Sequence, residues 1–263
     1  MLLKNLISNL KPNLAGLKIK GISFDSRNTK KGDLFVSVKG NKFDGNNYIK
    51  RAISKGAKLI IHSKEIKKNK KIQYLKVKNT REILAILGKR YYKKKPKNII
   101  AVTGTNGKTS VSDFFHQIFT IQNQKVGFIG TLGFKKNKQL TRRPLTTSDS
   151  LSLNKDLQKM KEAGIDNVII EASSHGLKQK RLDFLKIKAG IFTNLSQDHL
   201  DYHKSMGDYF NSKLLLFRKL LNKQSTIITD SDIKQFNVIK KIKQNRNLKI
   251  YSIGSRSNIF KVL

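Results

Sequence analysis

Short apolar runs and amphipathic helical patterns alternate from residue 98 to residue 230, and this alternation constrains the fold more than any other feature. The runs 98–103, 125–130 and 189–195 have the composition of buried strands. The stretch 150–164 carries apolar residues at helical spacing. Strands that alternate with helices favour a parallel sheet with helices on both faces. Ligands bind such sheets at the carboxyl ends of the strands, so we expect the functional site there.

A smaller unit precedes this region. Residues 33–38 and 58–62 are short apolar runs separated by a helical pattern, and a second helical stretch covers 79–92. We therefore predict an α/β protein with two parts. A small N-terminal α/β domain occupies residues 1–95, and a mostly parallel, P-loop-type central domain occupies residues 96–263.

Several protein classes are excluded by composition. The 263 residues include no cysteine, which excludes disulfides and thiolate metal sites. The chain has no apolar run of about 18 residues, the length at which a membrane helix is expected. The N-terminal sequence MLLKNLISNLKPNL lacks the features of a signal peptide. We expect no membrane span and a cytoplasmic location.

The formal net charge of +38 raises the hypothesis of a polyanion partner, such as nucleic acid. The lysines are spread along the whole chain, however, and no aromatic RNA-binding signature accompanies them. We interpret the charge as a solvated basic surface and expect no dedicated nucleic-acid function. A basic, nucleic-acid-binding NTPase remains as an alternative.

The sequence GTNGKTS directly follows the predicted strand 98–103 and leads into a helical pattern. Glycines allow backbone N–H groups to converge on phosphate oxygens, and a helix N-terminus adds its positive dipole end. Lys108 is expected to contact the β- and γ-phosphates, and the Thr109 hydroxyl to hold magnesium. The common pattern has a further glycine where this chain has Val102. The predicted phosphate-binding residues are Gly104, Thr105, Asn106, Gly107, Lys108, Thr109 and Ser110.

Two more polar stretches follow later strands. Glu171 ends the run NVIIE and is a candidate second magnesium ligand; the alternative is a solvent-exposed strand end. His199 and His203 are spaced four residues apart, which also suits a zinc site, so a metal-dependent hydrolase is a rival hypothesis. The H-E-x-x-H pattern of such enzymes is absent.

Lys213 belongs to the helical pattern 209–221. It lies three residues after Phe210 and four before Phe217, both in the apolar stripe, so we expect it on or beside the buried face. A buried lysine is costly unless it is paired or chemically altered.

Together these stretches resemble the Mur ligase family over nearly the whole chain. The matching segments are FDSRNTKKGDLFVSVKG, GTNGKTS, RPLTTSDS, EASSHGLKQKR and FTNLSQDHLDYH. They are most similar to the members that add the third residue of the peptidoglycan stem peptide. The resemblance implies that residues 1–95 bind a uridine nucleotide and that residues 96–263 form an incomplete ATP-binding domain. It also implies that a C-terminal ligase domain is absent from this sequence.

The resemblance further implies a reaction. ATP would phosphorylate the D-Glu side chain of UDP-N-acetylmuramoyl-L-Ala-D-Glu, and the amine of a diamino acid would then attack the acyl phosphate. Lys108, Glu171, His199 and Lys213 would be the catalytic residues. Magnesium would be held by Thr109, Glu171, His199 and Lys213, the last as a carbamate. The muramoyl-dipeptide nucleotide would be bound by Ser26, Arg27, Thr146, Thr147, Ser174, Gln179 and Arg181.

Three functions stay open at this point. The chain is a Mur ligase with intact motifs, whose remaining part belongs to a longer protein or comes from a second chain. Alternatively, it is a module that binds the sugar nucleotide and ATP without turnover. The third hypothesis is the basic NTPase already described.

Overall fold

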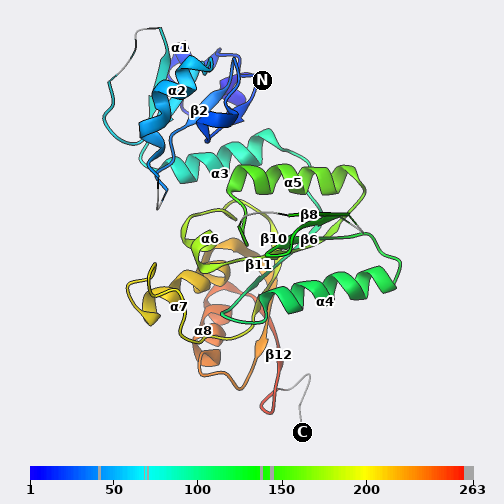
Figure 1. Cartoon of the computed structure of the whole chain (residues 1–263). Helices are drawn as coiled ribbons and strands as arrows, with labels where there is room; N and C mark the ends of the chain where they lie inside the picture. The colour runs from blue at the N-terminus through cyan, green and yellow to red at the C-terminus, as the bar shows by residue number, and fades with distance from the viewer. Residues whose placement is uncertain (41–42, 68, 70, 137–138, 143–144, 258–263) are drawn as a thin grey trace. The chain divides into compact units, whose positions relative to one another are not determined.

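Two β-sheets organise the chain, and each forms the centre of its own unit, Met1–Tyr91 and Tyr92–Leu263. The computed structural model describes all residues except 41–42, 68, 70, 137–138, 143–144 and 258–263 (Figure 1).

The first unit contains a parallel sheet of four strands in the order β1-β2-β3-β4. Phe35 and Ile60, on neighbouring strands, pack against Ile49 and Ala52 of helix α2 to form its core. The strands are β1 (Ile22–Ser23), β2 (Leu34–Val36), β3 (Leu59–His62) and β4 (Gln73–Lys76). The helices are α1 (Pro12–Ala15), α2 (Ile49–Ser54) and α3 (Thr80–Tyr91), with short 3-10 turns η1 (Leu3–Asn5), η2 (Ser26–Asn28) and η3 (Gly45–Tyr48).

The second unit contains an eight-stranded sheet in the order β12-β11-β10-β5-β9-β6-β7-β8. Adjacent strands of this sheet pair in parallel from β12 to β6. Strands β7 and β8 continue the sheet as an antiparallel extension. The strands are β5 (Asn98–Thr103), β6 (Val126–Gly130), β7 (Gly133–Lys136), β8 (Gln139–Thr141), β9 (Asn167–Glu171), β10 (Ile187–Phe192), β11 (Leu221–Asp230) and β12 (Lys249–Ile253).

Helices cover both faces of this sheet, and Figure 1 shows α4 and α5 on opposite sides of it. Strand residues alternate between the faces: Ile99 and Ala101 of β5 belong to the larger core, whereas Val102 belongs to a smaller one. Val111 and Phe115 of α4 pack on the smaller core. The helices are α4 (Lys108–Ile121), α5 (Ser150–Glu162), α6 (Ser174–Lys178), α7 (Met206–Leu215) and α8 (Phe236–Arg246).

The predicted α/β architecture with mostly parallel sheets is confirmed. The predicted helix 209–221 is wrong at its end, because α7 passes into a π-helical turn, η4 (Leu216–Leu220), and Leu221 already begins β11. The Arg246 guanidinium donates hydrogen bonds to the carbonyls of Phe217 and Leu221 at 2.9 Å each. These bonds satisfy acceptors that the end of a helix would otherwise leave unpaired.

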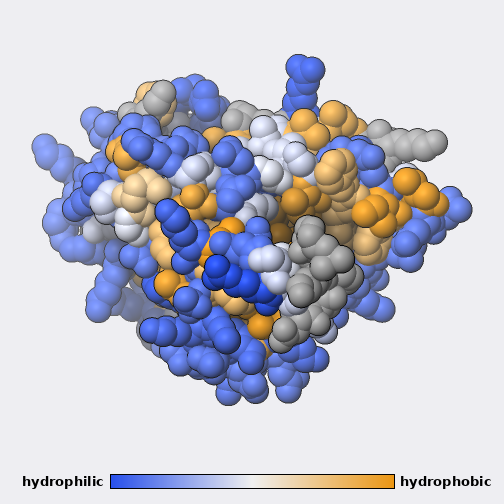
Figure 2. All heavy atoms as spheres, turned by 90° about the horizontal axis from the view of Figure 1, so that it is seen from below, coloured by the Kyte–Doolittle hydropathy of each residue, from blue (hydrophilic) through white to orange (hydrophobic). Residues whose placement is uncertain are grey.

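Hydrophilic side chains cover most of the face seen in Figure 2, while hydrophobic side chains gather on the side where α4 lies. Within the described part of the chain, no helix combines the length and the apolarity that crossing a bilayer requires.

Leu157 of α5 is fully buried in the larger core of the second unit. We expect Leu157→Ala to destabilise this unit by about 2–5 kcal/mol, because it removes buried methyl groups and leaves a cavity. Hydrogen exchange of the β9 amides measures this loss as a lower free energy of opening. Lys155→Ala, at an exposed position of the same helix, should leave that free energy nearly unchanged.

Candidate functional site

The loop between β5 and α4 has a backbone that requires glycine at two positions. Gly104 has φ +151°, and a Cβ there would lie 1.9 Å from the Thr193 hydroxyl. Gly107 has φ +81° and directly precedes α4. The end of β10 holds the same loop, since the Asn106 N–H donates to Asn194 Oδ1 at 2.9 Å and Thr193 Oγ1 donates to the Asn106 carbonyl at 2.6 Å. The loop is thereby fixed at the N-terminus of a 14-residue helix.

Two lysine side chains converge on this loop from different elements. Lys108 Nζ donates to the carbonyl oxygens of Gly104, at 3.0 Å, and Thr105, at 2.7 Å. Lys213 Nζ, from α7, donates to the same Gly104 oxygen at 2.6 Å and lies 4.1 Å from the centre of the Tyr209 ring. Lys213 is fully buried, as expected from its place in the helical pattern.

Both amines lose basicity in this environment. Burial lowers the pKa of Lys108. Burial, followed by the charge of nearby Lys108, lowers the pKa of Lys213 to about 7. At neutral pH, Lys213 therefore has a substantial fraction of uncharged amine.

Glu171 ends β9 as a fully buried carboxylate, so the hypothesis of a solvent-exposed strand end is wrong. Its oxygens accept hydrogen bonds from Thr109 Oγ1 at 3.1 Å and from Thr131 N–H and Oγ1 at 3.0 Å each. Gly130 makes room for it, because a Cβ there would lie 2.2 Å from Glu171 Oε1. Two of the three donors to this buried carboxylate are hydroxyl groups. The carboxylate oxygens are therefore suited to bind a hard divalent cation, which prefers oxygen ligands.

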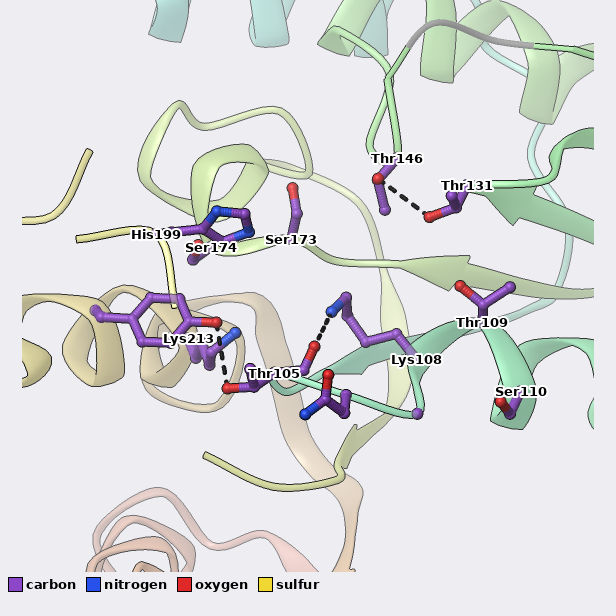
Figure 3. A pocket seen from close by; sticks show the side chains of 13 residues that line it. Thr105, Lys108, Thr109, Ser110, Thr131, Thr146, Ser173, Ser174, His199 and Lys213 are labelled. Atoms are coloured by element: carbon purple, nitrogen blue, oxygen red, sulfur yellow. Dashed lines mark hydrogen bonds between the residues drawn. The ribbon is translucent and has the colours of Figure 1, made fainter. Parts of the chain in front are cut away.

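A pocket of about 260 Å³ opens between these groups (Figure 3). Its lining residues follow the carboxyl ends of β5, β6 and β9, and others come from the segment between β8 and α5 and from the segments after β10. They are Thr105, Asn106, Gly107, Lys108, Thr109, Ser110, Thr131, Thr146, Ser173, Ser174, His199, Tyr209 and Lys213. Ten of these thirteen lining residues belong to the predicted site.

Other predicted residues lie beside the pocket lining. Thr147 Oγ1 donates to the Glu171 carbonyl at 2.7 Å, and the Arg181 guanidinium donates to the Thr147 carbonyl and to Gln179 Oε1. Thr147, Gln179 and Arg181 therefore form a hydrogen-bonded group that adjoins Thr146 in the chain. Residues 143–144 of the segment RPLTTSDS are outside the described residues.

The two spaced histidines have different surroundings. His199 is exposed at the pocket, with φ +53° and its Nε2 3.5 Å from Asp198 Oδ2. His203 is buried, and its Nε2 forms a 3.0 Å hydrogen bond with Ser174 Oγ. Burial lowers the pKa of His203. Among the residues that the structure describes, no three His, Asp or Glu side chains gather as a metal-binding group.

The sequence did not single out three lining residues, Thr131, Ser173 and Tyr209. Thr131 directly follows β6, so the rule that ligands meet strand ends could have identified it. Tyr209 lies four residues before Lys213 and hydrogen-bonds through its hydroxyl to Thr105 Oγ1 at 3.3 Å. Its aromatic character alone gave no such signal.

Ser26 and Arg27 belong to the first unit. Ser26 is buried at the start of η2, while Arg27 is exposed and pairs with Asp25 in a two-point contact, Nε to Oδ1 at 3.0 Å and Nη2 to Oδ2 at 2.7 Å. The hydrogen bond from Arg27 holds the pKa of Asp25 below its usual value.

Comparison with known proteins decides the family. The model of the Mur ligase middle domain matches residues 102–262, and that of the Mur ligase family catalytic domain matches residues 18–92. The chain belongs to the Mur ligase family. The resemblance inferred from the sequence motifs is thus confirmed.

Among curated relatives, the Mur ligase chain is 40% identical over 256 residues to the UDP-N-acetylmuramoyl-L-alanyl-D-glutamate–2,6-diaminopimelate ligase of Rickettsia montanensis. That alignment covers 95% of this chain and 53% of the relative. The ligase of the same name from Clostridium tetani is 36% identical, with 98% and 54% covered. The chain therefore spans about half the length of these relatives.

Solved structures agree with this assignment. A structure of a UDP-N-acetylmuramoyl-L-alanyl-D-glutamate–2,6-diaminopimelate ligase matches 98% of this Mur ligase chain, and 53% of its own, with 28% identity and a TM-score of 0.82. MurF from Acinetobacter baumannii matches 92% of this chain, and 49% of its own, with 21% identity and a TM-score of 0.64, which shows a shared fold.

The lowered pKa of Lys213 predicts how stability depends on pH. The unfolded chain holds a proton on this lysine up to its ordinary pKa of 10.5, whereas the folded chain releases it above about 7. The unfolded state thus binds more protons in this window, so stability rises with pH. We expect the wild-type chain to gain stability relative to Lys213→Met between about pH 7 and pH 10.

Urea unfolding in buffers free of carbon dioxide measures this difference, because carbon dioxide could modify the free amine. Lys219→Met, at an exposed position of η4, is the matched control and should follow the wild-type curve at each pH. Parallel curves for wild type and Lys213→Met would contradict the lowered pKa.

Proposed function

We propose that this chain carries the nucleotide-binding part of an ATP-dependent ligase that acts in the cytoplasm. The reaction joins diaminopimelate to UDP-N-acetylmuramoyl-L-alanyl-D-glutamate, which are the substrates in the names of the relatives from Rickettsia montanensis and Clostridium tetani. The observation that carries the proposal is the buried Glu171 carboxylate, hydrogen-bonded to Thr109 beside the glycine loop.

The chain's residues fit a magnesium–triphosphate group. Gly107 places no side chain over the loop, Gly104 lets the loop pack closely against Thr193, and the N-terminus of α4 adds its dipole. Thr109, Thr131 and Glu171 offer the hard oxygen atoms that magnesium prefers. ATP bound there would supply the phosphoryl group that activates a carboxylate. A related fold, the Thermotoga maritima MurF ligase, is described as a complex with ADP.

Lys108 provides the mobile positive charge of the site. Its ammonium group now bonds to the carbonyls of Gly104 and Thr105, which are weak partners for a full charge. An incoming phosphate would attract it away from these carbonyls, because the phosphate carries full negative charge whereas a carbonyl oxygen carries only a partial one. Lys108 thereby holds and orients the phosphate chain.

His199 and Lys213 would serve a second magnesium ion. Lys213 would first react as the neutral amine: its nitrogen bonds to the carbon of carbon dioxide and loses a proton, which leaves a carbamate. Burial favours this step, because it lowers the pKa of the amine to about 7. Carbamate formation would replace a buried positive charge with oxygen ligands for a metal ion next to the phosphate loop.

We assign the sugar nucleotide to two regions. Residues 1–95 would bind the uridine end through Ser26 and Arg27, and residues 96–263 would form the ATP-binding central domain. The division of contacts at Tyr91 supports this boundary. Thr146, Thr147, Ser174, Gln179 and Arg181 would hold the pyrophosphate and the muramoyl-peptide.

Amide formation requires more than the described pocket. The acyl phosphate and the amine must be held within about 3–3.5 Å of each other while water is excluded. We propose that the region which the relatives carry beyond the aligned half supplies these functions, in the same polypeptide or as a second chain. A preference for diaminopimelate over lysine would reside in that region.

The proposed function predicts the effect of two substitutions. The protein tested is this chain joined to the part of the Rickettsia montanensis ligase that follows the aligned region. Lys108→Ala and Glu171→Gln should each lower tripeptide formation by about a hundredfold or more, since each removes a contact to developing charge. Mass spectrometry of the nucleotide product measures this rate.

Lys94→Ala, at an exposed lysine before β5, is the control and should keep near-normal turnover. If the joined protein with wild-type residues binds ATP and the sugar nucleotide but forms no tripeptide, the chain is a binding module and the ligase proposal is wrong. Normal turnover by Glu171→Gln would contradict the magnesium assignment.

A further inference from the structure

A chain of polar side chains leads from the pocket into the protein behind Ser174. Ser174 begins α6 and lines the pocket, although its exposed fraction is only 1%. Its Oγ lies 3.0 Å from Nε2 of His203, which is also 1% exposed. His203 Nδ1 in turn lies 3.5 Å from Oδ2 of Asp208, in the first turn of α7. The order Ser, His, Asp is that of a proton-transfer chain, and its serine end is at the pocket.

The neighbours of His203 fix the position of its proton. Two oxygens approach Nδ1 at 3.5 Å each, Asp208 Oδ2 and Ser212 Oγ. The hydrogen bond from Lys178 lowers the pKa of Asp208, so this carboxylate is ionised at neutral pH and only accepts. The Ser212 hydroxyl already donates to the Asp208 carbonyl at 2.8 Å, which leaves its oxygen as an acceptor. The ring therefore carries its proton on Nδ1 and presents Nε2 as an acceptor.

This tautomer determines what Ser174 offers to the pocket. Nε2 of His203 accepts the serine's hydroxyl proton, so the lone pairs of Oγ remain for a ligand. A pyrophosphate oxygen is a poor partner for these lone pairs, whereas the N–H of an amine is a good one. Figure 3 shows Ser174 and His199 at one side of the pocket, across from Thr109. The geometry therefore favours a contact of Ser174 with the peptide and amine end of the substrates.

His203 is suited to take up a proton through this serine. Burial first, and then the charge of Lys178, lower its pKa, so the ring is neutral near pH 7. A proton gained at Nε2 would create an imidazolium beside the Asp208 carboxylate, which stabilises the new charge. Lys178, bonded to Asp208 at 2.7 Å, and nearby Lys213 oppose that charge. These cations keep the ring neutral between turnovers, as a general base requires.

We propose that Ser174 and His203 form the proton relay that deprotonates the attacking amine, and that Asp208 holds the ring in the required tautomer. The amine nitrogen bonds to the acyl carbon, and the carbon–oxygen bond to phosphate breaks. Phosphate leaves with the electron pair of that bond. The proton of the nitrogen passes to Ser174 Oγ as the serine's own proton passes to His203 Nε2. This inference rests on the proposed function and adds the general base for its second step.

Hydroxylamine separates the relay from the formation of the acyl phosphate. Its nitrogen is unprotonated near neutral pH, so it converts an acyl phosphate to a hydroxamate without a base in the protein. The protein tested is this chain joined to the part of the Rickettsia montanensis ligase that follows the aligned region. With diaminopimelate and hydroxylamine supplied separately, Ser174→Ala and His203→Gln should each lower the ratio of tripeptide to hydroxamate by about a hundredfold or more. Mass spectrometry measures both products.

Ser225→Ala is the matched control. It removes another buried hydroxyl, which donates to the Ile187 carbonyl at the amino end of β10, and it should leave the ratio unchanged. Equal losses of both products in Ser174→Ala and His203→Gln, or unchanged ratios, would overturn the relay. A wild-type joined protein that forms no hydroxamate would instead refute the proposed function, and the relay with it.

The tautomer of His203 provides a test that needs no reaction. Long-range proton–nitrogen correlation spectra of the chain with isotopically labelled histidine distinguish the two ring nitrogens, and His203→Gln identifies the signals. The relay predicts a neutral ring protonated on Nδ1, whose Nε2 signal shifts in Ser174→Ala because that nitrogen loses its donor. A ring protonated on Nε2 would overturn the relay.

Discussion

The buried carboxylate of Glu171 is the constraint on which the site depends. It lies fully inside the protein, and its hydrogen-bond donors come from Thr109 at the start of α4 and Thr131 after β6. A buried charge is costly unless neighbouring groups satisfy it, and these contacts therefore fix three strand ends against one another. The same carboxylate requires glycine at position 130, because any side chain there would collide with it.

A second focus of the site is a single backbone carbonyl, that of Gly104. Lys108 and Lys213 both donate to it, although they are separated by about a hundred residues in sequence. Two ammonium groups near one oxygen repel each other, and the lowered pKa of Lys213 reflects its burial first and this repulsion second. The repulsion between the two lysines is relieved when one of their amines is neutral. An anion bound near both nitrogens would stabilise the pair further. This balance supports the proposed phosphate site.

The sequence was sufficient to predict the elements whose signals are local. Strand-to-helix alternation and the glycines at 104 and 107 predicted the parallel sheet and the loop, because each depends on a few neighbouring residues. The extension β7–β8 and the edge strand β12 were not predicted, since their short, partly exposed strands lack a strong apolar pattern. Tyr209 was missed because its role arises from a contact 104 residues away, whereas Thr131 directly follows β6 and its place at a strand end was a usable signal.

We propose that the loop, Lys108 and Glu171 form one binding site for a magnesium–nucleotide complex. Calorimetric titration of the chain with ATP, with and without magnesium, tests it most directly. Binding should be at least about tenfold tighter with magnesium and lose this dependence in Glu171→Gln, because the Glu171 carboxylate is a charged oxygen donor bonded to Thr109. Binding that is equally tight without magnesium, or no binding at all, would contradict the account.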